Sequence, residues 1–444
     1  MKFTKFGKAL LMSALSTGVV LSISSCVQSY SVGFLYVTGN VTAQTTGNGI
    51  ISGFKIDHNT GKLSPIAGLP VSSGGANPGR AILLTGGRFI YVLNRGTTAS
   101  GSFDCTPTDP CTSANITQFS IGGNGVLSPQ QTFTTQGNNP FRLVADSAGN
   151  YLYVLDHDAP NGTGCSLALG PSVTKCGDIT AFKIDPTTGR LSLIVNAQVT
   201  SASGAPLPYF PVPANPIDMA LASSSALLTI SGTPATGDSV FPYTYNPGNG
   251  QLTVNQNSSQ PLGISQATGI VVAGGVTYVM DNEPPSPNTT GAHSQLLAYT
   301  LGTNGALQAQ VNGIIPIDPS QSNPVYLIAE SKGKFLYLAN QGNNTDPTNA
   351  QSGLSAFQVL TPFQLTPIPN GGQTSGTGAG PQCLLEDPSN QFVYTGNFNS
   401  STVTGSSIDQ NSGNLKPLSQ TTKASDTYTL KGPAAWCIVT GRTS

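Results

Sequence analysis

YLYVLDH, residues 151–157, is one of six versions of the same strand-like stretch in this chain. Tyr, Phe, Val and Leu fill each stretch, and a polar residue ends most of them, which is typical of a short β-strand running into a turn. The other five copies are FLYVTGN (34–40), FIYVLNR (89–95), VTYVMDN (276–282), FLYLANQ (335–341) and FVYTGNF (392–398). This repetition indicates one structural unit used many times along the chain.

Each copy stands second in a longer repeating unit. An Asn-Pro or Gly-Pro pair opens the unit, and a short apolar run follows it. After the aromatic strand, a variable loop leads to a third strand, such as DITAFKI (178–184), and a turn of the DPTTGRL kind (185–191) opens a fourth. The units begin about 50 to 76 residues apart, at 77, 139, 215, about 266, 323, 380 and 432. Repeated four-stranded units of this period predict a β-propeller, whereas a β-sandwich has no such repeat and a β-helix has a much shorter one.

The two ends of the chain determine the number of blades. The N-terminal unit lacks its first strand and begins at Phe34, whereas the C-terminal unit consists of a first strand alone, GPAAWCIVTG (432–441). Together they make one blade, so we expect an all-β, seven-bladed propeller over residues 33–444. The C-terminal strand would join the N-terminal blade and cover the two free edges of an open array.

The first 26 residues are expected to lie outside the propeller. Lys2, Lys5 and Lys8 precede a mostly apolar stretch, Ala9 to Ile23, and the sequence ISSC ends at Cys26. This resembles a bacterial lipoprotein signal, which implies a lipidated Cys26, a short tether at 27–32 and membrane attachment through the lipid. By resemblance to the Gram-negative sorting rule, Val27 favours the outer membrane of the cell envelope. An ordinary secretory signal and a short membrane anchor are the alternatives.

Charge is scarce in this sequence. Asp, Glu, Lys and Arg make up 8% of the residues, against about 25% in typical soluble domains, and the formal net charge is −1. No cluster of Lys and Arg provides a nucleic-acid footprint, so we expect no nucleic-acid partner.

Six cysteines remain after Cys26, an even number that suggests disulfides in an exported protein. Two pairs close small loops and are expected to bond locally, which leaves the last two cysteines for each other. The expected pairs are Cys105 with Cys111, Cys165 with Cys176, and Cys383 with Cys437. A zinc site is the rival interpretation, but no Cys-x-x-Cys occurs and no His stands at ligand spacing. We therefore expect no metal and no cofactor.

The most variable residues of the repeat are expected to gather at one end of the channel. In a propeller the first strand of each blade lines the channel, and the unit openings and the loops after the second strands lie at the same end. The polar residues at these positions are Arg80, Arg95, Arg142, Asp156, His157, Asp218, Asp281, Glu283, Tyr326 and Asn340. Two enlarged loops, 95–115 and 157–178, each contain one cysteine pair, so we expect stapled loops to form a ridge or lid beside this mouth.

The alternation of FLYVxN, hxxFxID and xTGxL motifs resembles the bacterial seven-bladed lactonase-like propellers, the 6-phosphogluconolactonase and muconate cycloisomerase superfamily. The resemblance covers residues 33–444 and implies hydrolysis of a small sugar or organic-acid lactone at the channel mouth. These enzymes place His, Glu and Arg near the mouth. Lactone opening needs a base or a metal to activate water and a cation for the oxyanion, so we expect His157 as the base, Arg95 or Arg142 as the anion partner, and Glu283 across the mouth. We expect Arg80, Arg142, Asp156, Asp281 and Asn340 to contact the ligand.

A second function remains open beside hydrolysis. The chain has no Gly-x-Ser-x-Gly nucleophile motif. His157 is alternatively a solvated side chain at a strand end, and the oxygen-rich residues Asp156, Asp158 and Asn161 match a calcium loop only incompletely. A non-catalytic propeller that binds a protein, peptide or glycan through the same face therefore stays the alternative.

Overall fold

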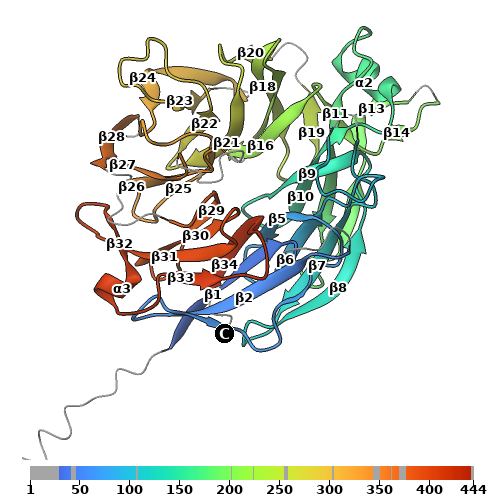
Figure 1. The fold of residues 1–444 in the computed structure, drawn as a ribbon. Coiled ribbons are helices and arrows are strands. Elements are labelled where there is room, and N and C mark those ends of the chain that lie inside the picture. Colours follow the sequence, from blue (N-terminus) through green and yellow to red (C-terminus); the bar gives the residue numbers. More distant parts are fainter. Residues whose placement is uncertain are drawn as a thin grey trace, which may run out of the picture.

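The structure is a computed structural model, and seven antiparallel sheets are arranged in a ring in the part of the chain that it describes (Figure 1). The innermost strands of the ring line a central channel. The described residues are 30–41, 47–106, 109–201, 203–223, 225–254, 259–302, 305–343, 351–361, 363–369 and 377–441. The predicted seven-bladed propeller is confirmed. The proposed signal peptide and Cys26 lie outside the described residues, and the first strand begins at Ser31.

The blades are numbered here from the N-terminus, and each is built outward from the channel. The innermost strands are β34 (Trp436–Gly441), β5 (Pro78–Leu83), β9 (Asn138–Ala145), β16 (Pro216–Ser223), β21 (Ala267–Ala273), β25 (Pro324–Ala329) and β29 (Pro381–Glu386). The second strands are β1 (Ser31–Gly39), β6 (Phe89–Asn94), β10 (Tyr151–Asp158), β17 (Ala226–Thr233), β22 (Val276–Asp281), β26 (Phe335–Asn340) and β30 (Phe392–Asn397). Each innermost strand contacts those of both neighbouring blades, so the seven form a closed circle.

The outer strands complete the blades. The third strands are β2 (Ile50–Asp57), β7 (Asn115–Ile121), β11 (Gly177–Ile184), β18 (Gly237–Tyr245), β23 (Gln295–Leu301), β27 (Gly353–Thr361) and β31 (Thr402–Ile408). The fourth strands are β3 (Leu63–Pro65), β8 (Leu127–Phe133), β12 (Leu191–Ile194), β19 (Leu252–Val254), β24 (Leu307–Pro316), β28 (Gln364–Ile368) and β32 (Leu415–Pro417). Short additions are β4 (Val71–Ser72), β13 (Asn196–Thr200), β14 (Pro206–Leu207), β15 (Phe210–Val212), β20 (Gln260–Pro261), β33 (Thr427–Thr429) and the helices α2 (Gly162–Leu169) and α3 (Leu418–Thr421).

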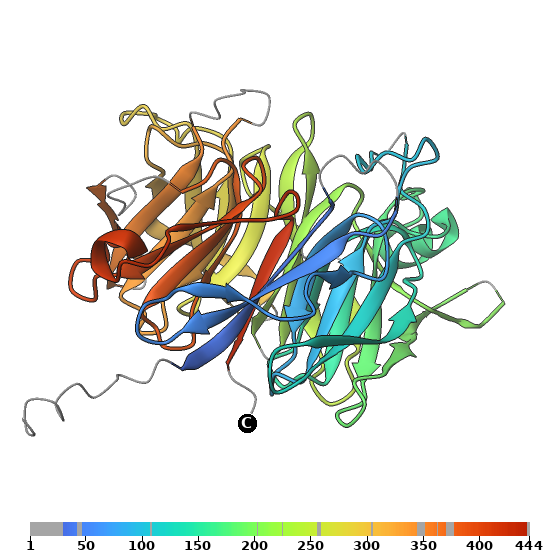
Figure 2. The ribbon, with the colours of Figure 1, turned by 60° about the horizontal axis from the view of Figure 1, so that its bottom comes forward.

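The ring closes where the sequence predicts. β34 pairs antiparallel with β1, from Gly33 opposite Gly441 to Thr38 opposite Trp436, and Figures 1 and 2 show the red last strand beside the blue first one. The disulfide Cys383–Cys437 links this closing strand to β29 of blade 7. Both edges of β1 are therefore paired, one with β34 and the other with β2.

The tyrosine and the glycine that recur in the repeat link adjacent blades by a hydrogen bond. The buried second-strand tyrosine donates its hydroxyl proton to a glycine carbonyl in the turn between strands three and four of the next blade. Tyr153 reaches the Gly250 oxygen at 2.9 Å, and Tyr394 of blade 7 reaches Gly61 of blade 1 at 2.6 Å. The acceptor glycines have positive φ, 73° at Gly250 for example, a conformation that glycine adopts without strain. Among the described residues this bond occurs at five of the junctions, and it explains both the recurrent Tyr and the recurrent Gly there.

The Asn-Pro openings also have a conformational cause. Asn77, Asn139, Asn215 and Asn323 all have φ between 53° and 55°, in the left-handed region that Asn tolerates better than most residues. The following proline is the first residue of the innermost strand in blades 2, 4 and 6 and its third residue in blade 3, near the strand start where a missing N–H is tolerated. Gly380 replaces Asn in blade 7 and also has positive φ, 67°.

All three predicted disulfides are confirmed: Cys105–Cys111, Cys165–Cys176 and Cys383–Cys437. The two local bridges fold their loops differently. The loop around Cys165 forms helix α2, which the turn-rich sequence did not predict. Asn161 accepts a hydrogen bond from the Gly164 N–H at the first turn of this helix.

Within the described residues, no helix has the length and apolar content needed to cross a membrane.

Candidate functional site at the channel mouth

The polar pairs that end the second strands point in two directions, as alternate residues of a strand do. The first member of each pair lies inside the blade. Asn340 donates to the Ser355 hydroxyl at 2.9 Å, Asp156 accepts from the Thr180 hydroxyl at 3.0 Å, and Asp281 accepts from the Gln295 amide at 2.7 Å. These three residues have no exposed surface, and none lines the mouth cavity described below. Their positions indicate blade packing, although we expected ligand contacts.

The second member of several pairs faces the channel mouth instead. Arg95, Gln341 and Phe398 immediately follow the buried Asn94, Asn340 and Asn397. They border a cavity of about 490 Å³, here called the mouth cavity. Its full lining is Asn40, Val41, Asn77, Pro78, Gly79, Arg80, Arg95, Phe103, Asp104, Phe141, Arg142, Gln341, Gln382, Phe398, Pro433, Ala435 and Trp436. The second strands of blades 1, 2, 6 and 7 therefore each place a residue at the mouth cavity, and in blades 2, 6 and 7 this residue follows the buried Asn.

Two arginines on the innermost strands share one buried carboxylate. Arg142 donates from Nε to Oδ1 of Asp218 at 2.9 Å, and an Nη atom of Arg80 lies 3.9 Å from Oδ2. Asp218 also accepts the backbone N–H groups of Met219 and Ile270, at 2.9 and 3.1 Å. Asp218 on β16 therefore fixes Arg142 on the neighbouring strand β9 and leaves Arg80 only a long ion pair.

Arg95 is the third cation of the mouth. Its Nη2 donates to Oδ1 of Asn139 at 3.2 Å, while its buried Nε has no hydrogen-bond partner within the described residues. Burial and the nearby positive charge of Arg142 lower the pKa of Arg95 to about 10, against the opposing effect of Asp104. Burial and Arg142 likewise lower the pKa of Arg80 to about 10. At neutral pH the cavity holds three guanidinium cations, so it favours an anion or a developing negative charge.

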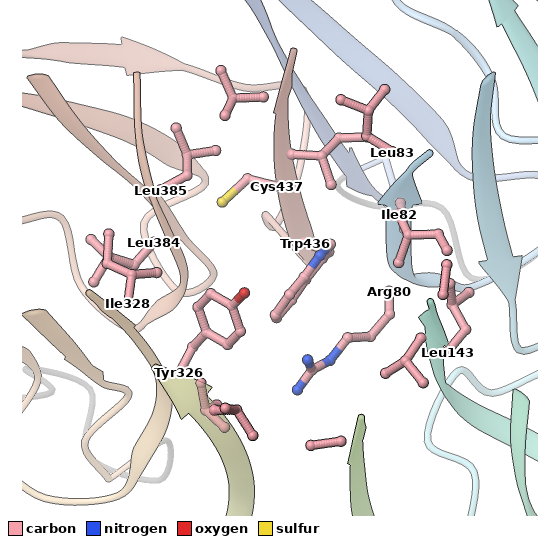
Figure 3. A pocket seen from close by; sticks show the side chains of 18 of the residues that line it. Arg80, Ile82, Leu83, Leu143, Tyr326, Ile328, Leu384, Leu385, Trp436 and Cys437 are labelled. Carbon is pink, nitrogen blue, oxygen red and sulfur yellow. The ribbon is translucent and has the colours of Figure 1, made fainter. Parts of the chain in front are cut away.

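Arg80 marks the inner boundary of the mouth cavity. Its guanidinium carbon lies 4.0 Å from the centre of the Trp436 ring and 5.6 Å from that of Tyr326, and Figure 3 shows the three side chains directed into one space. Arg80 and Trp436 also line a second cavity of about 540 Å³, here called the channel cavity, which follows the innermost strands of all seven blades. The two cavities therefore meet at this stacked pair.

One stapled loop contributes directly to the mouth. Phe103 and Asp104 precede the Cys105–Cys111 bridge and line the cavity, and the Asn77 side-chain amide donates to the Phe103 carbonyl at 2.8 Å. The prediction of a stapled ridge beside the mouth holds for this loop. The other stapled loop packs helix α2 against β13 and β15, and none of its residues lines the mouth cavity.

The three residues expected to perform catalysis are not all at the mouth. Arg95 lines the cavity, whereas His157 and Glu283 do not. His157 is bonded through Nδ1 to Asp158 at 3.1 Å and lies behind Phe141, with ring centres 6.2 Å apart. Glu283 accepts a hydrogen bond from the Ser265 hydroxyl. Neither residue therefore lines the mouth cavity with the arginines, and each is held by a local partner.

Sequence reasoning did not select Phe103, Asp104, Gln382 or Trp436. Asp104 and Phe103 were identifiable only as residues of a stapled loop that follows Arg95, and a disulfide spacing does not say which way its loop folds. Cys437 lies opposite Val37 as Ala81 lies opposite Val92 in blade 2, so Trp436, one residue earlier, takes the place that Arg80 has in blade 2. Aligning the closing strand by this register, rather than by its Gly-Pro opening, places Trp436 in the channel.

Comparisons with known proteins agree with this architecture. A family profile described as "Lactonase, 7-bladed beta-propeller" matches residues 33–167 and 289–434. No curated protein sequence matches the chain.

Solved structures resemble the chain over nearly their full lengths. A Bacteroides fragilis protein with a provisional 6-phosphogluconolactonase assignment is 16% identical, with a TM-score of 0.62 over 92% of this chain and 98% of that one. A periplasmic gluconolactonase of Pseudomonas aeruginosa is also 16% identical, with a TM-score of 0.61 over 92% and 99% of the two chains. At these identities the structures show a shared fold. The profile match extends over more than half of the sequence and over both ends of the ring, and this chain belongs to the lactonase family of seven-bladed β-propellers.

Proposed function

We propose that the protein hydrolyses a small sugar or organic-acid lactone in the mouth cavity. The observation that carries this proposal is the convergence of Arg80, Arg95 and Arg142 on one cavity in a propeller of the lactonase family. Lactone opening creates an oxyanion at the carbonyl carbon and ends in a carboxylate. Preorganised cations in a partly buried cavity stabilise both charges.

Asp104 is the residue that we assign as the base. It is the carboxylate of the mouth whose charge raises the pKa of Arg95, so the two groups lie near each other. In the proposed step, Asp104 accepts a proton from a water molecule while the water oxygen bonds to the lactone carbonyl carbon. Arg95 stabilises the oxyanion. Collapse breaks the bond between that carbon and the ring oxygen, which takes the proton from Asp104, and the product is a hydroxy acid.

The test compares variants of the chain that begins after Cys26. A panel of five- and six-membered lactones is assayed for turnover above spontaneous hydrolysis. We expect Asp104→Asn and Arg95→Gln to lower kcat/KM about a hundredfold or more, the usual effect of losing a general base or an oxyanion donor. His157→Ala and Glu283→Ala are the matched controls outside the cavity and should keep the parent activity. A loss confined to the two controls would return the catalytic role to His157 and Glu283.

A specific observation favours one alternative. Among the described residues that line the mouth cavity there is no His and no Glu, and Asp104 is solvent-exposed. A non-catalytic propeller that holds an anionic group of a glycan, peptide or protein uses the same arginines without a base. Background turnover in every protein of the panel, together with arginine-dependent binding of a carboxylate, would select this alternative over hydrolysis.

We also propose that the propeller works outside the cytoplasm, attached to the cell envelope through a lipid on Cys26. Three disulfides are typical of exported proteins, and the N-terminal residues resemble a lipoprotein signal. Fractionation of cells fed a radiolabelled fatty acid tests this. The parent should be labelled and membrane-bound, whereas Cys26→Ser should be unlabelled, and an unlabelled parent would refute the anchor.

A further inference from the structure

The channel cavity has a lining unlike that of the mouth cavity. All seven innermost strands contribute to it, mostly with aliphatic side chains such as Ile82, Leu143, Val272, Ile328 and Leu384. Among the described lining residues, Arg80 and Glu386 are the ones with charged side chains. A sugar ring beside the aliphatic stretch of the channel would lose water without gaining hydrogen bonds to those side chains, whereas a hydrocarbon would gain from leaving water.

The two cavities form one path. Arg80 and Trp436 line both, and their stacked contact of 4.0 Å holds the guanidinium at the junction. No hydrogen bond joins the Arg80 guanidinium to a residue that the structure describes, and its ion pair to Asp218 is long, at 3.9 Å. Its donors are thus available to an anionic group that sits in the mouth directly above the aliphatic lining.

The two ends of this path carry side chains of opposite charge. Gln382 of β29 lines the mouth cavity, and Glu386 ends the same strand about 13 Å further along, at ~3.3 Å per residue. Glu386 accepts the Ser331 N–H at 2.7 Å and stays in the channel wall. Arginines at one end and a carboxylate at the other favour an anionic head at the mouth and disfavour it at the far end.

We propose that the ligand is amphiphilic, with its lactone ring or carboxylate in the mouth cavity and an unbranched aliphatic chain in the channel cavity. The inference rests on the proposed function, in that the mouth must first bind the anionic head. It narrows the substrate class to lactones that carry an alkyl chain, whose hydrolysis yields a hydroxy fatty acid.

Binding of straight-chain carboxylates tests the inference without requiring turnover. Butanoate through dodecanoate are titrated by calorimetry below their micelle concentrations. The affinity should rise about fourfold with each added methylene, which corresponds to the burial of one CH₂. Ala329→Leu narrows the channel from β25 and should remove the gain for the longest chains while leaving butanoate unchanged. Ala197→Leu, an exposed position on β13, is the matched control and should behave as the parent does.

The outcomes separate this inference from the proposed function. Equal affinity from butanoate to dodecanoate, combined with weaker butanoate binding in Arg95→Gln, would overturn the aliphatic channel and retain the anionic mouth. A gain with chain length that Ala329→Leu leaves intact would also overturn it, because the chains would then lie elsewhere. Affinities that Arg95→Gln leaves unchanged for every carboxylate would refute the anion site, and the proposed function with it.

Discussion

Asp156 and Asp178 lie opposite each other on β10 and β11, and neither side chain has exposed surface. The same place in blade 2 holds Asn94 and Asn115, whose side chains share a hydrogen bond of 2.8 Å. Burial raises the pKa of Asp156 to about 8, and burial together with the Asp156 charge raises the pKa of Asp178 well above its usual value. Two adjacent buried carboxyl groups avoid the repulsion of two charges by retaining a proton.

Asp156→Asn should therefore stabilise the propeller. The folded state binds a proton that the unfolded state releases near pH 4, so the stability of the parent decreases as pH rises from about 4 to about 8. Asn at this position recreates the amide and hydroxyl arrangement of Asn94 and Thr117. We expect a gain of ~1–3 kcal/mol in the free energy of unfolding at pH 8 and a smaller gain at pH 5, measured by urea denaturation.

Asp158→Asn serves as the control for this prediction, because Asp158 is half-exposed beside the pair. It should change the free energy of unfolding by less than ~0.5 kcal/mol at both pH values. A lower stability of Asp156→Asn at pH 8 would show that the buried pair carries a stabilising charge instead.

The tyrosine that closes the last junction should contribute measurably to stability. Tyr394→Phe removes the hydroxyl that donates to the Gly61 oxygen and leaves a buried carbonyl without its donor. We expect a loss of ~1–2 kcal/mol in the free energy of unfolding. Tyr30→Phe, at a 49% exposed ring, should change little under the same denaturation measurement. Equal effects at the two positions would mean that the inter-blade bond adds no net stability.

The closing disulfide should matter more to the fold than the disulfide at the mouth. Replacing both Cys383 and Cys437 with Ala should lower the free energy of unfolding by ~2–5 kcal/mol, because the bridge spans 54 residues. The Cys105–Cys111 bridge spans 6 residues, so its double replacement should cost less stability but weaken carboxylate binding at the mouth. Thermal unfolding and calorimetry of both variants check the two effects, and a reversed order of stabilities would contradict the prediction.

Asp218→Asn should lower stability and increase anion affinity together. The substitution removes the counter-charge of Arg142 and Arg80, and it leaves two partly buried guanidinium groups facing each other. We expect a loss of ~2 kcal/mol in the free energy of unfolding in chloride, moderated because the arginines are 18–25% exposed. Added phosphate should raise the Tm of the variant more than the Tm of the parent. An equal rise in both proteins would show that Asp218 does not compete with a bound anion for Arg142 and Arg80.

The fold was predictable because the signals that specify it are local and repeated. The Asn-Pro openings, the Tyr of each second strand and the Gly of each outer turn recur in most blades, and each has a backbone or inter-blade role. Blade 4 lacks the aromatic signature, and its second strand, β17 (Ala226–Thr233), was identified by position only. The disulfides followed from short spacings and from pairing the remaining two cysteines.

The site was less predictable because it depends on side-chain direction. Consecutive polar residues at the end of a second strand face different ways: Asn94 lies inside its blade, whereas Arg95 lines the mouth cavity. A one-residue shift in strand register reverses which side chain faces the mouth. Irregularities such as the one between Leu155 and Asp156 produce such shifts. Asp104 entered the site through a loop whose course the sequence does not encode in any periodic pattern.

The pairing of Thr38 with Trp436 joins residues separated by 398 positions, and this separation sets the order in which the ring can form during synthesis. While the polypeptide is being made, β1 emerges first and keeps one edge without a partner until β34 is available. Ring closure is thus a final event that requires almost the complete polypeptide. Under the export that we propose for this chain, the ring would close only after the last strand has crossed the membrane.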